Sequence, residues 1–150
     1  MLSGKFSTSL VSSGLLALAK RSLKLSVKSC GQIESSQINS TENLKFKVDL
    51  KNVRGRDKNL YNVISDQIGE RLDGFGVCLG EMACTTCMVR FLKDSEMKLL
   101  NKSCTLSEEE IDMMETSNRF EHGRCRLACQ VKADVVHDCG INEIELVGLN

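Results

Sequence analysis

Apolar and polar residues alternate at every position over residues 44–50, LKFKVDL. One face of this segment carries its apolar residues, which are Leu44, Phe46, Val48 and Leu50, and the other face carries two lysines and an aspartate. A period of two residues is typical of a strand with one buried face. We therefore predict a half-buried β-strand over residues 44–50.

Helical spacing replaces this alternation in the next segment, where apolar residues recur at Leu60, Val63, Ile64 and Ile68. Positions three and four apart lie on one side of an α-helix. The pattern predicts a helix from about 59 to 71, with Asp57 or Asn59 as its N-cap.

A second helix has a start signal of its own in the segment LSEEEIDMMETS. Ser107 is the predicted N-cap, and Glu110, three residues later, completes a capping box. The helix is therefore expected to begin at Glu108.

Three further segments have the composition of short strands, and they cover residues 86–92, 126–138 and 142–149. Between the first predicted helix and the strand at 86–92, glycines at 74, 76 and 80 interrupt any regular pattern. An irregular loop is expected there.

The first thirty residues contain serine, leucine and basic residues but no acid. On a helix, the basic residues of this segment lie opposite its apolar residues, which is typical of a mitochondrial transit peptide. A secretory signal peptide is the alternative, because Leu15 to Ala19 is apolar and ends in a small residue. We predict a transit peptide at 1–30, a linker at 31–41 and one folded domain at 42–150.

Charge is distributed unevenly, although 20 basic and 20 acidic residues give a formal net charge of zero. Residues 1–33 hold five basic residues and no acid, so the remainder has five more acids than bases. An acidic domain is a poor match for phosphate backbones, so nucleic-acid binding is not expected. No apolar run approaches the length of about 18 residues that a membrane span needs.

Cysteine is the residue type that indicates chemistry, because the chain has eight cysteines, and three of them form the pattern Cys78-x5-Cys84-x2-Cys87. Small neighbours such as Gly80 and Ala83 allow the backbone to wrap closely around a common centre. Iron-sulfur clusters require four thiolates, together with hydrogen bonds to the sulfur atoms. The loop is therefore a candidate iron-sulfur site.

The chain resembles the adrenodoxin-type, mitochondrial 2Fe-2S ferredoxins at three places. These are the segment DGFGVCLGEMACTTC at 73–87, the segment RLACQV at 126–131 and the acidic segment SEEEIDMMET. The resemblance implies an α+β fold of the β-grasp type, a mixed sheet with a helix packed across it. It also implies that Cys78 and Cys84 bind one iron of a 2Fe-2S cluster and that Cys87 and Cys129 bind the other.

By the same resemblance the protein is an electron carrier and not an enzyme. It would be a monomer in the mitochondrial matrix or a related organelle. It would take electrons from an NADPH-dependent flavoprotein ferredoxin reductase and pass them to iron-sulfur cluster assembly or to a haem-thiolate monooxygenase. Partner binding is assigned to four acidic residues, Glu108, Glu109, Asp112 and Glu115. Taken without the resemblance, this charge run is an ordinary solvated helix face.

The sequence departs from the family pattern in three respects. Only eight residues separate Leu50 from Asn59, so the second strand of the expected initial hairpin is short or absent and the sheet is one strand smaller. Met88 stands where the family commonly has a histidine after the third ligand, which removes one hydrogen bond near the cluster. A proline-bearing C-terminal tail is missing, because the chain contains no proline.

Other uses of the cysteines remain open at this stage. Cys125 lies four residues before Cys129 and is the alternative fourth ligand, and both could join Cys84 and Cys87 in a structural zinc site. A zinc-stabilised interaction module is therefore the second hypothesis. A thioredoxin-like dithiol lacks its cis-proline, and a Rieske centre lacks paired histidines, since His122 and His137 are isolated. Cys30, Cys104 and Cys139 are interpreted as small hydrophobic residues or exposed thiols.

Overall fold

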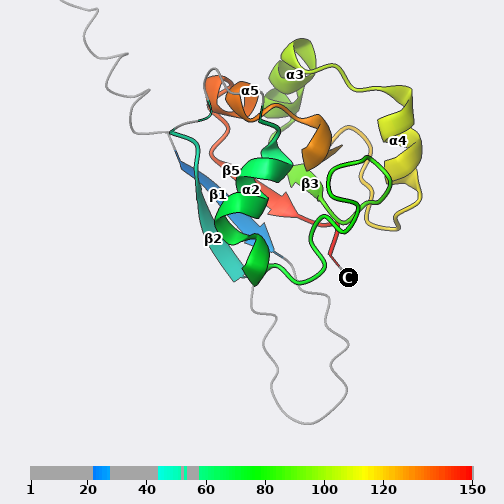
Figure 1. Cartoon of the computed structure of the whole chain (residues 1–150). Helices are drawn as coiled ribbons and strands as arrows, with labels where there is room; N and C mark the ends of the chain where they lie inside the picture. Colours follow the sequence, from blue (N-terminus) through cyan, green and yellow to red (C-terminus); the bar gives the residue numbers. More distant parts are fainter. Residues whose placement is uncertain (1–21, 28–43, 52, 54–57, 150) are drawn as a thin grey trace, which may run out of the picture.

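A mixed sheet of five strands, in the order β2-β1-β5-β3-β4, organises this computed structural model (Figure 1). The structure describes residues 22–27, 44–51, 53 and 58–149. Its strands are β1 (Ser22–Val27), β2 (Leu44–Asp49), β3 (Met88–Phe91), β4 (Cys125–Leu127) and β5 (Glu143–Leu146). β1 and β5 are parallel, whereas the other neighbouring strands are antiparallel.

The helices are α2 (Leu60–Ile68), α3 (Asp94–Ser103), α4 (Glu108–Glu115) and α5 (Ala133–Asp138), with short 3-10 turns η1 (Gly69–Arg71) and η2 (Ala128–Gln130). α2 packs against β2 and η2. The predicted fold class, a mixed sheet with a packed helix, is confirmed. In the described part of the chain, no helix combines the length and the apolar character that crossing a membrane requires.

β2 and α2 form where the hydrophobic pattern predicts them. Phe46 and Val48 are buried, while the lysines between them are exposed. Of the two candidate caps, Asn59 is the one observed, because its side-chain oxygen accepts a hydrogen bond of 2.8 Å from the backbone N–H of Asn62. Asp57 lies outside the described residues.

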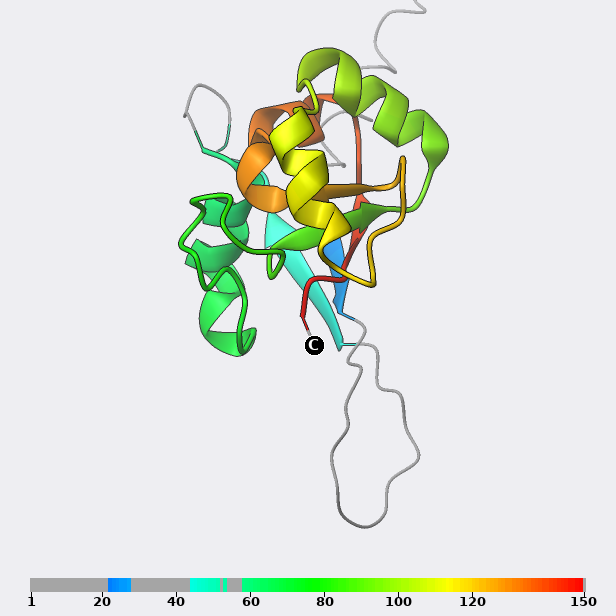
Figure 2. The same ribbon diagram turned by 90° about the vertical axis from the view of Figure 1, so that its right-hand side faces the viewer.

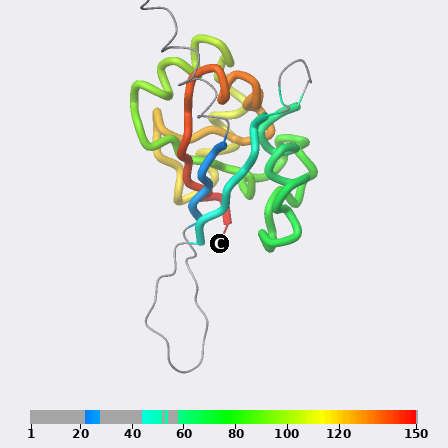
Figure 3. Tube along the Cα trace, turned by 90° about the vertical axis from the view of Figure 1, so that its left-hand side faces the viewer, coloured from blue at the N-terminus to red at the C-terminus, as the bar shows by residue number. Residues whose placement is uncertain are grey.

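β1 corrects the predicted domain boundary. The range 1–30 was assigned to a transit peptide, yet Ser22–Val27 lies between β2 and β5 in the sheet (Figure 3). Leu23 and Leu25 are completely buried. The folded domain therefore includes residue 22 and does not begin at 42. The remainder of the predicted leader, and the linker at 31–41, lie outside the described residues.

The same strand corrects the expected strand count. β1 and β2 pair as an antiparallel hairpin over six residue pairs, from Ser22 with Asp49 to Val27 with Leu44. The second strand of the hairpin was expected after Leu50. The strand that pairs with β2 is instead β1, which precedes it in the chain. The sheet therefore has five strands, and the prediction of a smaller sheet is wrong.

Two helices were not predicted. α3 follows β3 directly and buries Met97 and Leu100, three positions apart, with Asp94 and Glu96 in its first turn. The segment 126–138 was predicted as one strand, but only β4 is a strand and η2 and α5 follow it. Ala133 and Val136 are both completely buried, which is the i, i+3 spacing of a helix face.

Candidate metal centre

The cysteine loop wraps around the ring of Tyr61, which α2 holds in place. Gly76 and Gly80 lie against this ring with positive φ angles of 63° and 86°. A Cβ atom on Gly76 would lie 2.1 Å from the ring carbon Cε2, which leaves no room for any other residue type. The Phe75 ring stacks on the Tyr61 ring, and the two ring centroids are 5.5 Å apart. The small residues of the loop therefore serve its close packing on α2.

The four predicted ligands meet as two pairs of thiols. The Cys84 side chain lies close enough to that of Cys78 to affect the pKa of Cys78, and the same holds for Cys87 and Cys129. Cys84 also acts electrostatically on Cys87, so the two pairs are neighbours. Cys87 is fully buried, whereas Cys78 is half-buried. The loop alone supplies three of the sulfur atoms, and η2 brings the fourth from 42 residues farther along the chain.

Backbone amides surround the more exposed sulfur atom. Burial raises the pKa of the Cys78 thiol, but hydrogen bonds from Cys84 and from the backbone of Ala83, Gly80 and Glu81 outweigh it and leave the pKa lowered. Hydrogen bonds to the charged form favour a thiolate. This part of the loop is therefore arranged to hold negative charge on sulfur.

In the second pair, Cys87 and Cys129, the pKa values of the two thiols shift in opposite directions. A hydrogen bond from Cys87 lowers the pKa of Cys129 to about 6 against the effect of burial, and Gln130 and the backbone of Met82 add to the lowering. The same contact, together with burial, raises the pKa of Cys87. The side-chain N–H of Gln130 donates to Cys129 Sγ over 3.5 Å. The directions of the two pKa shifts therefore favour negative charge on Cys129 over Cys87.

Thr86 secures the inner part of the loop. Its hydroxyl oxygen accepts a hydrogen bond of 3.2 Å from the backbone N–H of Val77 and lies 3.0 Å from Cys84 Sγ. One side chain therefore joins the first and last turns of the loop next to a candidate ligand.

The C-terminal end of the described chain packs against the loop. Val147 and Gly148 both donate backbone hydrogen bonds to the carbonyl oxygen of Met88, at 3.0 and 3.1 Å. A Cβ atom on Gly148 would lie 2.0 Å from the carbonyl oxygen of Thr85. The end of the chain docks here without the family's proline. The Met88 side chain, in the place of the family's histidine, is completely buried.

Cys125 points away from the four paired thiols. Its sulfur accepts a hydrogen bond of 3.4 Å from the backbone N–H of Glu121, and burial raises its pKa. Of the two candidates for the fourth ligand, Cys129 is therefore the one that the structure places with the loop cysteines.

A binuclear centre matches this arrangement. Two pairs of thiols suit two metal ions with two thiolates each, as in a 2Fe-2S cluster, whereas a structural zinc site needs four ligands around one ion. Among the described residues, no group of three or more His, Cys, Asp or Glu side chains is placed so that it could hold a metal ion, of either kind, without some rearrangement. The residues present fit the cluster, and their role as its ligands stays a prediction.

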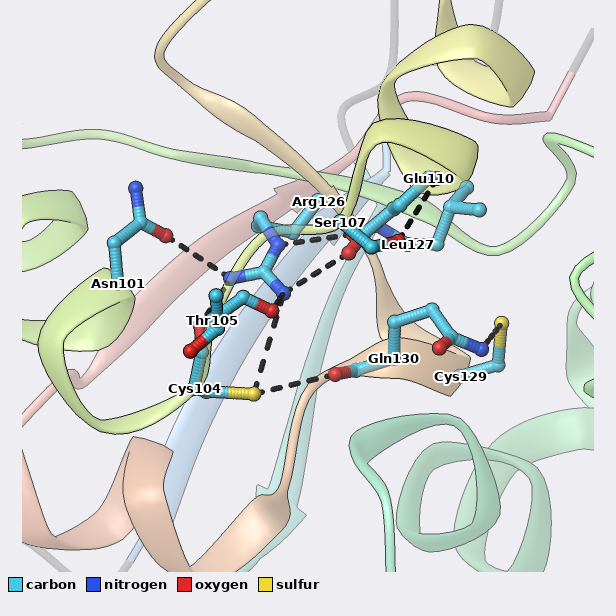
Figure 4. A network of polar contacts seen from close by, with 9 residues as sticks. All are labelled: Asn101, Cys104, Thr105, Ser107, Glu110, Arg126, Leu127, Cys129 and Gln130. Atoms are coloured by element: carbon cyan, nitrogen blue, oxygen red, sulfur yellow. Dashed lines mark hydrogen bonds and ion pairs between the residues drawn. The ribbon is translucent and has the colours of Figure 1, made fainter.

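Behind Cys129, a buried ion pair joins α4 to β4 (Figure 4). Arg126 is fully buried and donates from Nε and Nη2 to the two carboxylate oxygens of Glu110, at 2.9 and 3.0 Å. Glu110 also accepts a hydrogen bond of 2.8 Å from the backbone N–H of Leu127. The sequence pattern predicted a capping box between Ser107 and Glu110, and only the contribution of Ser107 is observed. Ser107 caps the backbone N–H of Glu110 at 3.1 Å, but the Glu110 carboxylate faces β4.

Cys104 extends this network toward the metal centre. The guanidinium of Arg126 donates to the Cys104 carbonyl oxygen at 2.9 Å, and the Cys104 thiol donates to the Gln130 carbonyl oxygen at 3.2 Å. A continuous chain of contacts thus links Glu110, at the start of α4, to the residue beside Cys129 (Figure 4). Sequence reasoning missed it, because an arginine between two apolar residues gives no signal of its partner.

The four predicted partner-binding residues are all exposed on α4, and they are Glu108, Glu109, Asp112 and Glu115. α4 and the cysteine loop lie on the same side of the molecule, which faces the reader in Figure 2. The acidic side chains and the candidate metal centre can therefore face one partner together. Partner binding by these residues stays a prediction.

Comparison with known proteins shows which proteins this chain is similar to in sequence. No protein-family model matches the chain. Over 60 residues, 40% of the chain, the sequence is 37% identical to mitochondrial adrenodoxin of Bos taurus and 37% identical to adrenodoxin of Ovis aries. These matches span only 30% and 43% of the two relatives.

The fold has relatives among solved structures. A ferredoxin from Rhodopseudomonas palustris HaA2 superposes with a TM-score of 0.55 at 15% identity, over 86% of this chain and 98% of that one. A reduced putidaredoxin variant from Pseudomonas putida gives 0.52 at 16% identity, over 84% and 97%. The chain therefore has the fold of these ferredoxins, and its matched segment is similar in sequence to the adrenodoxins.

Proposed function

We propose that the protein is a one-electron carrier that holds a 2Fe-2S cluster through Cys78, Cys84, Cys87 and Cys129. The observation that carries this proposal is the pairing of these thiols, Cys78 with Cys84 and Cys87 with Cys129. When bound, the cluster supplies the one-electron redox chemistry. The likeness to adrenodoxins supports the choice of cluster.

The chain's own residues bind, orient and shield the site. The loop holds three sulfur atoms in a fixed wrap around Tyr61, and the backbone N–H groups at positions 80 to 83 offset the negative charge of thiolates. Cys87 is buried, which excludes water from the inner side, while half-buried Cys78 lies toward the surface. An electron can enter and leave on that outer side.

The exposed acidic residues of α4 indicate which partners the protein binds. We propose that the exposed acids of α4, with Glu108 and Asp112 among them, meet basic residues of an NADPH-dependent flavoprotein ferredoxin reductase. The acceptor would be iron-sulfur cluster assembly proteins or a haem-thiolate monooxygenase. Complementary charge mainly raises the association rate, which suits a carrier that must bind and leave. A single acidic surface would serve donor and acceptor in turn.

The proposed location is the mitochondrial matrix or that of a related organelle. The likeness to proteins named as mitochondrial adrenodoxins supports it, and so does the basic, acid-free composition of residues 1–21. In this proposal the targeting segment ends before Ser22, because β1 belongs to the sheet.

Absorbance and metal analysis test the cluster. The purified protein is expected to be brown, to contain two irons and two sulfides, and to bleach with dithionite. Cys129→Ser should abolish or strongly alter the visible spectrum, whereas Cys125→Ser should keep it, because the Cys125 sulfur faces Glu121. A colourless protein with stoichiometric zinc would instead establish the zinc-stabilised interaction module.

Charge reversal tests the partner surface. Asp112→Lys with Glu115→Lys should slow reduction by the reductase and flatten its salt dependence, with the visible spectrum intact. Glu70→Lys, an exposed acid on η1, is the matched control. Equal reduction rates for the wild type, the double variant and Glu70→Lys would show that α4 is an ordinary solvated helix.

A further inference from the structure

Two exposed apolar side chains flank Cys78 on the outer turn of the loop. Five large hydrophobic residues of the described chain are exposed, and the two most exposed are Leu79 at 79% and Val77 at 64%. They stand directly before and after Cys78, one of the two candidate ligands that are only half-buried. The other three are scattered, with one on β2, one directly after β3 and one on α3, at 41% to 48% exposure.

The fold itself gains little from a leucine at position 79. Its φ angle is 56°, in the left-handed region that leucine adopts only at an energetic cost. Asparagine or glycine would adopt this angle with less strain. The side chain is also mostly in water, so burial does not compensate for the strain. Neither backbone geometry nor core packing accounts for this residue.

The turn that carries these side chains is held in one conformation. The backbone N–H of Leu79 donates to the Gly76 carbonyl oxygen at 2.8 Å, and Glu81 N–H donates to the Cys78 carbonyl oxygen at 3.2 Å. Beneath it, Gly76 and Gly80 pack on the Tyr61 ring. An apolar contact presented on a fixed turn loses little conformational entropy on binding.

Acidic residues border this turn. Asp73 and Glu81 are exposed on the same loop, and α4, the helix that carries the exposed acids, lies on the same side of the molecule (Figure 2). An apolar centre with a charged rim is the usual anatomy of a protein interface. A partner that fits it has an apolar patch bordered by lysine and arginine.

We propose that Val77 and Leu79 are the apolar centre of the surface through which this protein docks its electron-transfer partner. The partner presents an apolar patch over its own redox cofactor, with basic residues around it. This inference rests on the proposed carrier function. The apolar contact sets how long the complex lasts, while the acids of α4 set how fast it forms. Docking at this turn also brings the partner's cofactor next to Cys78.

Leu79→Asn provides a sharp test, because asparagine tolerates the left-handed conformation. The variant should keep its visible spectrum and melting temperature. With a purified NADPH-dependent flavoprotein ferredoxin reductase, its KM as substrate should rise about tenfold, as expected when most of a leucine contact is lost. The salt dependence of the rate should not change. Leu79→Met keeps an apolar side chain and should keep the KM, and Leu99→Gln is the control at an exposed leucine on α3.

Equal KM values for Leu79→Asn and Leu99→Gln would overturn the docking surface. A wild-type protein that is brown and accepts electrons from the reductase would leave the carrier function standing in that case. A colourless wild-type protein would overturn the carrier function, and the docking surface with it.

Discussion

The ion pair between Glu110 and Arg126 gives the most quantitative prediction about stability. Both side chains are essentially inaccessible to water, with exposed fractions of 1% and 0%. Glu110→Gln keeps the shape of the side chain and removes its charge, so the guanidinium of Arg126 stays buried without a counter-charge. Removing one partner of a buried pair typically costs about 3–5 kcal/mol, against about 0–1 kcal/mol for an exposed pair.

The remaining contacts place the expected cost at the lower end of that range. Asn101 Oδ1 and the carbonyl oxygen of Cys104 still accept from Arg126, at 3.0 and 2.9 Å. The amide oxygen of the new glutamine can still accept from the backbone N–H of Leu127. We therefore expect a loss of about 3 kcal/mol, which for a domain of this size lowers the melting temperature by roughly 10 °C.

Thermal unfolding followed by far-ultraviolet circular dichroism, at one scan rate for all proteins, measures the effect. Glu109→Gln is the matched control, because Glu109 is exposed next to Glu110 and should change stability by no more than about 0.5 kcal/mol. Arg126→Met combined with Glu110→Gln should recover part of the loss, since it removes the unpaired charge. If Glu110→Gln melts within about 2 °C of Glu109→Gln, the buried charge is not costly and the reasoning fails.

Three further predictions concern the sheet, the loop and the cluster environment. A chain that starts at Ser22 should yield brown, folded protein, whereas a chain that starts at Gly31 should not, because it lacks the buried strand β1; equal yields of brown protein from both would refute this. Gly76→Ala should lose its visible absorbance during purification, because its Cβ would lie 2.1 Å from the Tyr61 ring; a stable spectrum would show that the loop can relax. Gln130→Leu should keep the visible spectrum and lower the reduction potential by up to about 60 mV, a tenfold change for one electron, because a hydrogen bond to sulfur favours the more negative, reduced form. A redox titration that finds an unchanged or higher potential would contradict the role given to Gln130.

Local patterns were sufficient for elements whose signals lie within a few residues. The alternation at 44–50 predicted β2, the helical spacing from Leu60 predicted α2, and Ser107 marked the start of α4. The cysteine spacing and its small neighbours indicated the loop and singled out its chemistry. In each case the residues that decide the structure are close together in the chain.

Other features depended on partners far away in the sequence. The segment Ser22–Val27 has a composition that suits a basic leader, and it becomes a strand because β2 and β5 take up both of its edges and the core takes its leucines. The α3 helix lacks a strong start signal, since Lys93 at its N-cap makes no side-chain capping bond.

The sequence by itself determined the periods of β2 and α2, the irregular loop and the cysteines that are candidates for binding metal. Only the tertiary structure decided where the domain begins, which of Cys125 and Cys129 lies beside the loop cysteines and what Glu110 contacts. The physical reason is that burial creates these preferences. A carboxylate in water can cap its own helix, but once buried beside a fully enclosed guanidinium it must compensate that charge.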